Sequence, residues 1–385
     1  MIEKINGDTL TNDMNEALIL NLFLYFDLSI FGGSRSDPYD FGEIMQYLQE
    51  NIKDYVANQK DNTLPEYLAV IEAYSRTHPE ISDYVITNVS VSDPKYSGIR
   101  GLNAVAFSRT GKDGIRRITV AFRGTAAGEW YDNGQGLGGI EVGPDKGSLQ
   151  QQEAVRYFED TCRELKIRRK DYLTLTGHSK GGNKVQYILM ISLYADSAKA
   201  VYSFGGQGFS PEAVAHFKGK LGETFVEKVK KIFNISAAND YVNVLGDSII
   251  PRENNYYIKT DCIWLYQNHY PNAILKKDGS FKALKKNPHE PGFWGQTVKN
   301  ASDKIMRLPA SERNEITIGI MTIAQRVLGR GAPVNKEKMN PLLMFTAAIK
   351  SIGYLATAAF ETLTRRIFKQ PRAPSEVSQQ VTHER

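Results

Sequence analysis

The spacing of apolar positions changes character along the chain. Residues 14–31 are apolar and helix-prone, and two further helical stretches cover residues 41–58 and 65–77. Residues 84–91, 103–108 and 116–122 have the composition of strands, the last two joined by a glycine-containing turn. The opening of the chain therefore predicts a helical layer that covers a sheet.

Strands and helices alternate from residue 149 onward. The pattern predicts strands at 171–176, 200–204 and 229–235, and helices at 149–167, 179–194 and 211–220. Such alternation is typical of a mainly parallel sheet with helices on both faces, and thus of the α/β class. After residue 290 the chain is helical again at 311–328 and 341–368, and we expect the polar residues 371–385 to be disordered. We therefore predict a domain at 1–290, a helical region at 291–370 and a tail.

Composition narrows the classes of function. The 385 residues carry a formal net charge of +5, too weak an excess to indicate nucleic-acid binding but compatible with an anionic lipid surface. The two cysteines, Cys162 and Cys262, form no zinc-binding pattern and no disulfide framework. No Sec signal peptide is visible after Met1, so we expect a cytoplasmic protein or one secreted without such a signal.

The strongest chemical signal is the segment Gly177-His178-Ser179-Lys180-Gly181. It follows the predicted strand at 171–176 and precedes a predicted helix, which is the context that gives G-x-S-x-G its meaning as a nucleophile elbow. Glycines permit the tight turn that exposes the serine oxygen, and the backbone N–H of Lys180 would stabilise an oxyanion. The alternative is a glycine-rich turn in which Ser179 only caps the helix.

A nucleophilic serine needs a histidine base and an acid that orients it, in the chain order Ser, Asp or Glu, His. Of the six histidines, only His269 and His289 remain plausible by position, and His269 follows a strand-like run at 262–265. Asp240 follows the predicted strand at 229–235; Asp247 is the second candidate and Asp261 the third. The alternatives are a surface-loop histidine and a turn aspartate.

Two motifs in this order resemble the class 3 lipases. Ala121-Phe122-Arg123-Gly124-Thr125, followed by Glu129-Trp130, precedes the elbow by about fifty residues, and Gly-His-Ser-Lys-Gly-Gly-Asn is similar to the elbow of the bacterial branch of that group. The resemblance covers residues 10–275 and implies an α/β-hydrolase that cleaves lipid esters, a lipase or phospholipase, with no metal or cofactor.

The resemblance also implies roles for particular residues. Thr125 would supply the other oxyanion donor, and Asp240 and His269 would complete the triad with Ser179. The segment 126–147 would be a lid; with 124–147 holding eight glycines, we expect a binding loop there instead of a regular element. The segment 204–209 departs from the family pattern because it lacks the usual proline.

The C-terminal helical stretch allows several readings. Residues 341–363 are apolar on most faces, with Lys350 near the middle and basic residues after them. This favours packing on the hydrolase domain, with a membrane surface or a protein partner bound through 341–372 as the alternative, and it disfavours a membrane span. For the whole protein, the alternatives to a lipid esterase are a thioesterase, a small-ester esterase and a non-catalytic binding protein; we expect no nucleic-acid partner.

Overall fold

A sheet in which the strand order follows the chain forms the centre of the molecule. The structure, a computed structural model, describes residues 11–26, 28, 37–59, 63–90, 102–125, 130–139, 147–328 and 341–368. Within these ranges there are eight strands: β1 (Tyr39–Asp40), β2 (Val85–Thr87), β3 (Ala104–Thr110), β4 (Arg116–Phe122), β5 (Tyr172–His178), β6 (Ala198–Phe204), β7 (Ile232–Ala237) and β8 (Asn255–Ile258). Strands β1 to β4 pair antiparallel and β4 to β8 pair parallel.

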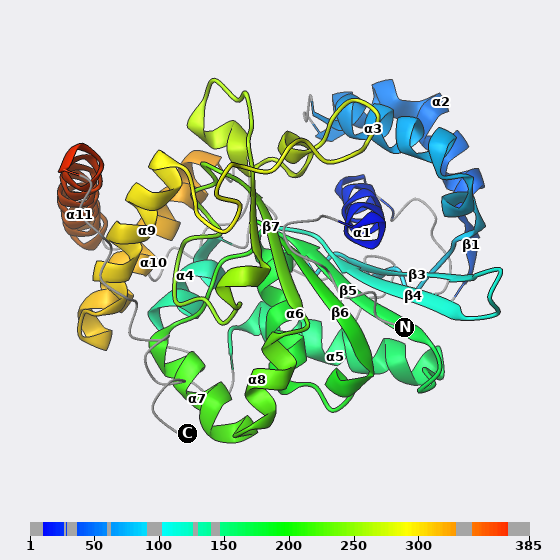
Figure 1. Ribbon diagram of the computed structural model, residues 1–385, viewed down its shortest axis with the longest axis horizontal. Coiled ribbons are helices and arrows are strands. Elements are labelled where there is room, and N and C mark those ends of the chain that lie inside the picture. The colour runs from blue at the N-terminus through cyan, green and yellow to red at the C-terminus, as the bar shows by residue number, and fades with distance from the viewer. Residues whose placement is uncertain are drawn as a thin grey trace.

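The parallel half places its connecting helices on one face. Crossovers between neighbouring parallel strands are right-handed in nearly all proteins, so consecutive crossovers in one direction return over the same side of the sheet. Helices α5 (Leu149–Glu164), α6 (Lys180–Ile191), α7 (Pro211–Leu221) and α8 (Thr224–Val229) lie together below the sheet in Figure 1. The other face would be exposed without a further layer.

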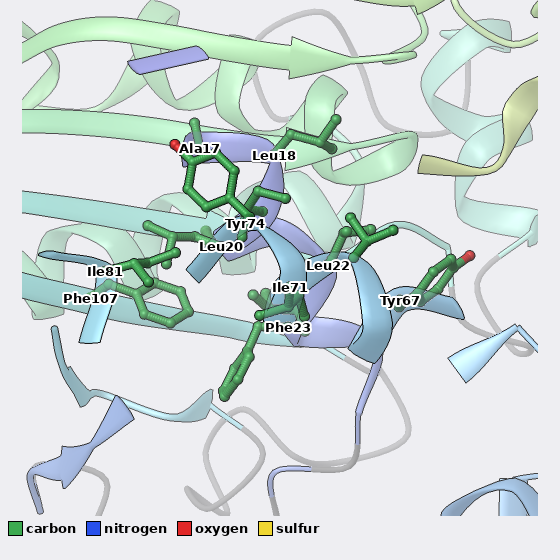
Figure 2. Close-up of a cluster of buried hydrophobic side chains, with 14 of the residues drawn as sticks. Ala17, Leu18, Leu20, Leu22, Phe23, Tyr67, Ile71, Tyr74, Ile81 and Phe107 are labelled. Carbon is green, nitrogen blue, oxygen red and sulfur yellow. The ribbon is translucent and has the colours of Figure 1, made fainter. Parts of the chain in front are cut away.

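The N-terminal helices form that layer. Helices α1 (Asn12–Leu22), α2 (Phe41–Gln59) and α3 (Leu64–Thr77) lie on the opposite side of the sheet from α5 and α6 (Figure 1). Figure 2 shows side chains from α1 and α3 meeting Phe107 of β3 in a buried cluster. Successive residues of β3 belong to different buried clusters. Val105 and Phe107 lie in the cluster with α1 and α3, and Ala104 and Ala106 lie in a second cluster with residues of α5 and α6. The α/β-hydrolase fold with an N-terminal helical layer is confirmed.

Of the C-terminal helices α9 (Phe293–Met306), α10 (Ala310–Leu328) and α11 (Pro341–Phe368), α10 packs against α4 (Trp130–Gly138), and α11 packs on α9 and α10. The buried guanidinium of Arg313 in α10 donates to the carbonyl oxygen of Gly138 at 3.2 Å and pairs with Glu212 of α7. Helix α11 is tied to α9 through an ion pair of 2.6 Å between Lys304 and Glu361. None of the helices in the described ranges has both the length and the apolar character needed to cross a membrane.

Several sequence predictions were wrong in detail. The run at 262–265 is not a strand; the strand there is β8, which ends earlier, and the chain then forms the 3₁₀ helix η7 (Leu265–His269). Within the glycine-rich segment, 130–138 form a helix, while 126–129 and 140–146 lie outside the described residues. The sequence also left α8 and α9 unrecognised, and Val229 ends α8 instead of starting β7. The predicted tail at 371–385 lies outside the described residues.

Candidate active site

Ser179 stands at a sharp turn between β5 and α6. Its φ of 57° and ψ of −123° lie in a region that non-glycine residues rarely adopt, and such strain is concentrated at functional sites. A Cβ on Gly177 would lie 2.2 Å from the backbone of Gly181, and one on Gly181 would lie 2.1 Å from the carbonyl oxygen of Phe122. Both positions therefore require glycine, and the packing of β4, β5 and α6 depends on it.

The structure brings Ser179, His269 and Asp240 together. The His269 Nε2 lies 2.8 Å from the Ser179 Oγ, and the Nδ1 lies 3.0 and 3.1 Å from the two Asp240 carboxylate oxygens. Asp240 is 2% exposed and also accepts a hydrogen bond from the Val242 N–H. Each of the three residues follows the carboxyl end of a parallel strand, the edge at which open α/β sheets place their sites. The arrangement suits transfer of the serine proton to the histidine.

The sequence analysis set His178 aside as a candidate base and gave no sign of its contacts beside the site. The His178 Nε2 lies 2.8 Å from the carbonyl oxygen of His269, and its Nδ1 lies 2.5 Å from the Tyr25 hydroxyl. Since the carbonyl can only accept, Nε2 carries the proton and Nδ1 accepts from Tyr25. Burial, and secondly the neighbouring His269, lowers the pKa of His178 well below its ordinary value. His178 is therefore a neutral ring that joins the N-terminal layer to the backbone of His269.

Gly205 directly follows β6 and lies beside Asp240 and His269. Its φ is +62°, and a Cβ there would lie 2.6 Å from the Asp240 Oδ2 and 3.4 Å from the His269 ring. The chain passes so close to the carboxylate that any side chain would displace it. The glycine thus leaves room for the contact between Asp240 and His269.

The two expected oxyanion donors lie on segments that adjoin Ser179. A Cβ on Gly124 would lie 3.1 Å from the Ser179 Cβ, so the strand that leads into Thr125 passes directly beside the elbow. The Thr125 hydroxyl accepts a hydrogen bond of 2.9 Å from the Asn133 side chain, which fixes this residue against α4. Lys180 is the first residue of α6, and the N–H of a first helical residue has no carbonyl partner within its helix.

The side chain of Lys180 turns away from Ser179 and is fully buried. Its Nζ lies 2.7 Å from a carboxylate oxygen of Asp132 in α4. The same carboxylate accepts from the Ser148 hydroxyl at 2.8 Å and from the Gln150 N–H at 3.0 Å. The elbow, α4 and the start of α5 are thereby linked through one carboxylate.

The alternative residues lie elsewhere. The His289 Nδ1 lies 2.9 Å from the carbonyl oxygen of Asn255, at the start of β8. Asp247 pairs through its backbone with Phe209, and burial raises the pKa of its carboxyl. Asp261 is exposed. No group of three or more His, Cys, Asp or Glu side chains suited to a metal ion occurs in the described part of the chain.

Two comparisons with known proteins found similarities to this chain. Residues 101–237 match the model of the Mbeg1-like family, a class 3 lipase-like family; this range contains Ser179 but ends before Asp240 and His269. No curated protein matches. Among solved structures, M37 lipase is similar at 13% identity and a TM-score of 0.37, over 81% of this chain and 100% of that one. The chain has the α/β-hydrolase fold, and over residues 101–237 it is similar to a class 3 lipase-like family, which supports a lipase-like hydrolase.

Proposed function

We propose that the protein is a serine esterase that cleaves acyl esters of lipids, as a lipase or a phospholipase of the A type. The observation that carries the proposal is the continuous hydrogen-bond path from the Ser179 hydroxyl through His269 to Asp240. A serine hydroxyl is a weak nucleophile at neutral pH, and an adjacent base held by a carboxylate is what activates it. The similarity of residues 101–237 to a lipase-like family is the reason to prefer lipid esters over other acyl compounds.

The reaction runs in two halves. The Ser179 Oγ attacks the ester carbonyl carbon while its proton passes to the His269 Nε2, and the carbonyl oxygen gains the negative charge. The backbone N–H groups of Thr125 and Lys180 donate to that oxygen. When the tetrahedral intermediate collapses, the C–O bond breaks and His269 returns the proton to the departing alcohol. Water then attacks the acyl-enzyme by the same steps, releasing the fatty acid and restoring the serine.

Asp240 orients the imidazole in this scheme. Its carboxylate accepts from the His269 Nδ1–H, which holds the Nε2 lone pair toward Ser179 and stabilises the imidazolium that forms. Because Asp240 is buried and bonded to the Val242 N–H, it cannot turn away from the ring without losing that partner.

The decisive experiment is release of fatty acid from phospholipid vesicles and from triacylglycerol emulsion, followed by mass spectrometry. We expect release by the wild-type protein and none by Ser179→Ala or His269→Ala. His289→Ala is the matched control and should keep its activity, since the His289 Nδ1 lies 2.9 Å from the carbonyl oxygen of Asn255 at the start of β8 and His289 has no role in the proposed reaction. No fatty acid from either lipid, together with turnover of a thioester or a short-chain soluble ester, would replace the proposal with a thioesterase or small-ester esterase.

If no fatty acid is released, labelling with a serine-directed fluorophosphonate distinguishes an enzyme that was given the wrong substrate from a protein without catalytic activity. Wild-type protein should be labelled at Ser179. If Ser179 does not react, the fold serves binding instead of catalysis, which was the third alternative from the sequence.

We also propose helix α11 as a surface for a membrane or a protein partner. Six large apolar side chains on it are exposed by about two-fifths or more: Phe345, Ile349, Ile352, Leu355, Phe360 and Leu363. Large apolar side chains exposed together are uncommon on monomers and mark interaction sites. Removing residues 341–385 should abolish binding to the membrane or partner and leave hydrolysis of a soluble ester unchanged. If hydrolysis falls and binding does not, α11 is a structural part of the hydrolase and not a binding surface.

A further inference from the structure

An exposed apolar segment ends three residues before the candidate catalytic histidine, His269. Four consecutive large side chains are exposed: Ile263 by 88%, Trp264 by 62%, Leu265 by 40% and Tyr266 by 52%. Single exposed apolar residues are ordinary, but a contiguous group held in water marks a surface that meets another apolar phase. The segment has no role in the proposed reaction.

The segment is held in this position by polar contacts beneath it. Asn268 is 5% exposed, accepts from the Thr260 hydroxyl at 2.6 Å and donates to the carbonyl oxygens of Trp264 and Leu265. The Trp264 N–H donates to the Gln267 side chain at 3.1 Å. These bonds fix the backbone of the loop while its apolar side chains project outward.

The same short element carries the segment and the site. Helix η7 begins at Leu265 and ends at His269, whose Nε2 lies 2.8 Å from the Ser179 Oγ. Leu265 and Tyr266 are therefore within two turns of this helix from His269, the proposed base. Trp294, 51% exposed, lies at the start of α9, where its N–H donates to Asn239, the neighbour of Asp240.

Charge along this part of the chain favours an anionic surface. Residues 259–286 contain six lysines and two aspartates, a net of +4 against +5 for the whole chain. Lys259, Lys276, Lys277 and Lys286 are exposed. Basic residues beside an apolar insertion add attraction to anionic headgroups, and tryptophan and tyrosine favour the boundary between headgroups and acyl chains.

We propose that residues 263–266 insert into the surface of an anionic phospholipid bilayer and dock the mouth of the active site on it. The functional consequence rests on the proposed lipid esterase, whereas insertion is measurable without catalysis. Ile263 and Trp264 enter the bilayer, and Tyr266 lies at the headgroup level. The four exposed lysines of 259–286 contact anionic headgroups.

The chain offers a direct reporter of insertion, because its three tryptophans are Trp130, Trp264 and Trp294. Ser179→Ala protein that also carries Trp130→Phe and Trp294→Phe retains Trp264 alone and cannot degrade the vesicles. On vesicles of equal phosphatidylcholine and phosphatidylglycerol, Trp264 emission should shift to shorter wavelength and be quenched by brominated acyl chains. Emission that does not move at saturating lipid, or quenching absent from a vesicle-bound protein, overturns the proposal.

Sedimentation with the same vesicles measures the contribution of the segment. Ile263→Ser combined with Trp264→Ser, in Ser179→Ala protein, should lower the partition coefficient by at least about tenfold, since burying one large apolar side chain accounts for about that factor. Leu193→Ser is the matched control: Leu193 is also 88% exposed but follows the end of α6 far from Ser179, and its loss should leave binding unchanged. Binding that survives the double substitution and is lost on removing α11 overturns the proposal, as does binding lost equally in the Leu193 variant. Insertion of Trp264 without fatty acid release by wild type would leave the inference standing and refute the esterase.

Discussion

Replacing His178 with phenylalanine is expected to impair hydrolysis although Ser179, His269 and Asp240 all remain. Phenylalanine keeps a ring of similar size and removes both ring nitrogens, one 2.8 Å from the His269 carbonyl oxygen and the other 2.5 Å from the Tyr25 hydroxyl. The backbone of His269 then loses the donor that fixes it, while the side chain keeps its bonds to Asp240 and Ser179.

The magnitude follows from the groups left without partners. A buried carbonyl that loses its donor costs about 1–3 kcal/mol, and displacement of a catalytic group by about 1 Å lowers a rate about 100-fold. We therefore expect kcat/KM to fall about 10- to 100-fold, and the unfolding free energy to fall by about 2 kcal/mol. Tyr25→Phe removes only the outer bond and should lower kcat/KM about 2- to 10-fold.

The assay is hydrolysis of a soluble short-chain ester by both single variants and the double variant, with thermal unfolding in parallel. If Tyr25 acts through His178, its substitution should have no further effect once His178 is phenylalanine, so the double variant should match His178→Phe. Multiplicative effects of the two changes, or full kcat/KM in a folded His178→Phe variant, would refute the reasoning.

Three further outcomes are expected. The pKa of His178 is lower in the folded chain than its ordinary value of 6.5, so protonation favours the unfolded chain. The unfolding free energy should therefore fall as the pH drops below about 6.5, by up to about 1.4 kcal/mol per pH unit. Urea titrations at several pH values should show a weaker pH dependence in His178→Phe. Gly205→Ala should lower kcat/KM at least about tenfold, since the φ of Gly205 is +62° and the added Cβ would meet Asp240. Gly219→Ala, with open space around it in α7, should keep its activity and gain up to about 1 kcal/mol in stability. Asp132→Asn should lower the unfolding free energy by about 3–5 kcal/mol by leaving the buried Lys180 ammonium uncompensated, and a smaller loss in the double variant with Lys180→Met, measured by denaturant unfolding, would identify the ion pair as the cause.

The secondary structure around the elbow could be predicted from the sequence because the apolar pattern and the glycine positions indicate the same elements there. Apolar strands bounded by helices at regular intervals gave β4, β5 and β6 nearly at their observed bounds, and Gly177 and Gly181 marked the turn. Elements without such signals were missed. Strand β8 has only four residues, and the sequence analysis placed a strand at the more apolar run 262–265 instead. In the structure Ile263, Trp264 and Leu265 of that run are exposed.

Apolar residues ordinarily indicate burial, so the sequence alone made 262–265 a strand. In the structure this run is an exposed loop that leads into η7. The side chains of Asn268 and Gln267 form hydrogen bonds with backbone groups of Trp264 and Leu265, which in a strand would bond to a neighbouring strand. Similarly, the glycines of 130–138 predicted a loop, yet Gly134 and Gly138 lie where α4 packs closely against α10. Packing against a distant helix had overridden local propensity.

The sequence by itself determined the fold class, the position of the candidate nucleophile and a short set of candidates for its partners, because each depends on residue type and local spacing. It preferred His269 and Asp240 but left His289 as a second candidate for the base, and Asp247 and Asp261 as further candidates for the acid. Only the tertiary structure brought His269 and Asp240 to Ser179 and linked His178 to Tyr25 across 153 positions of the chain. Such contacts join strand ends and layers far apart in sequence, so they depend on how the whole sheet is assembled, and no local pattern contains them.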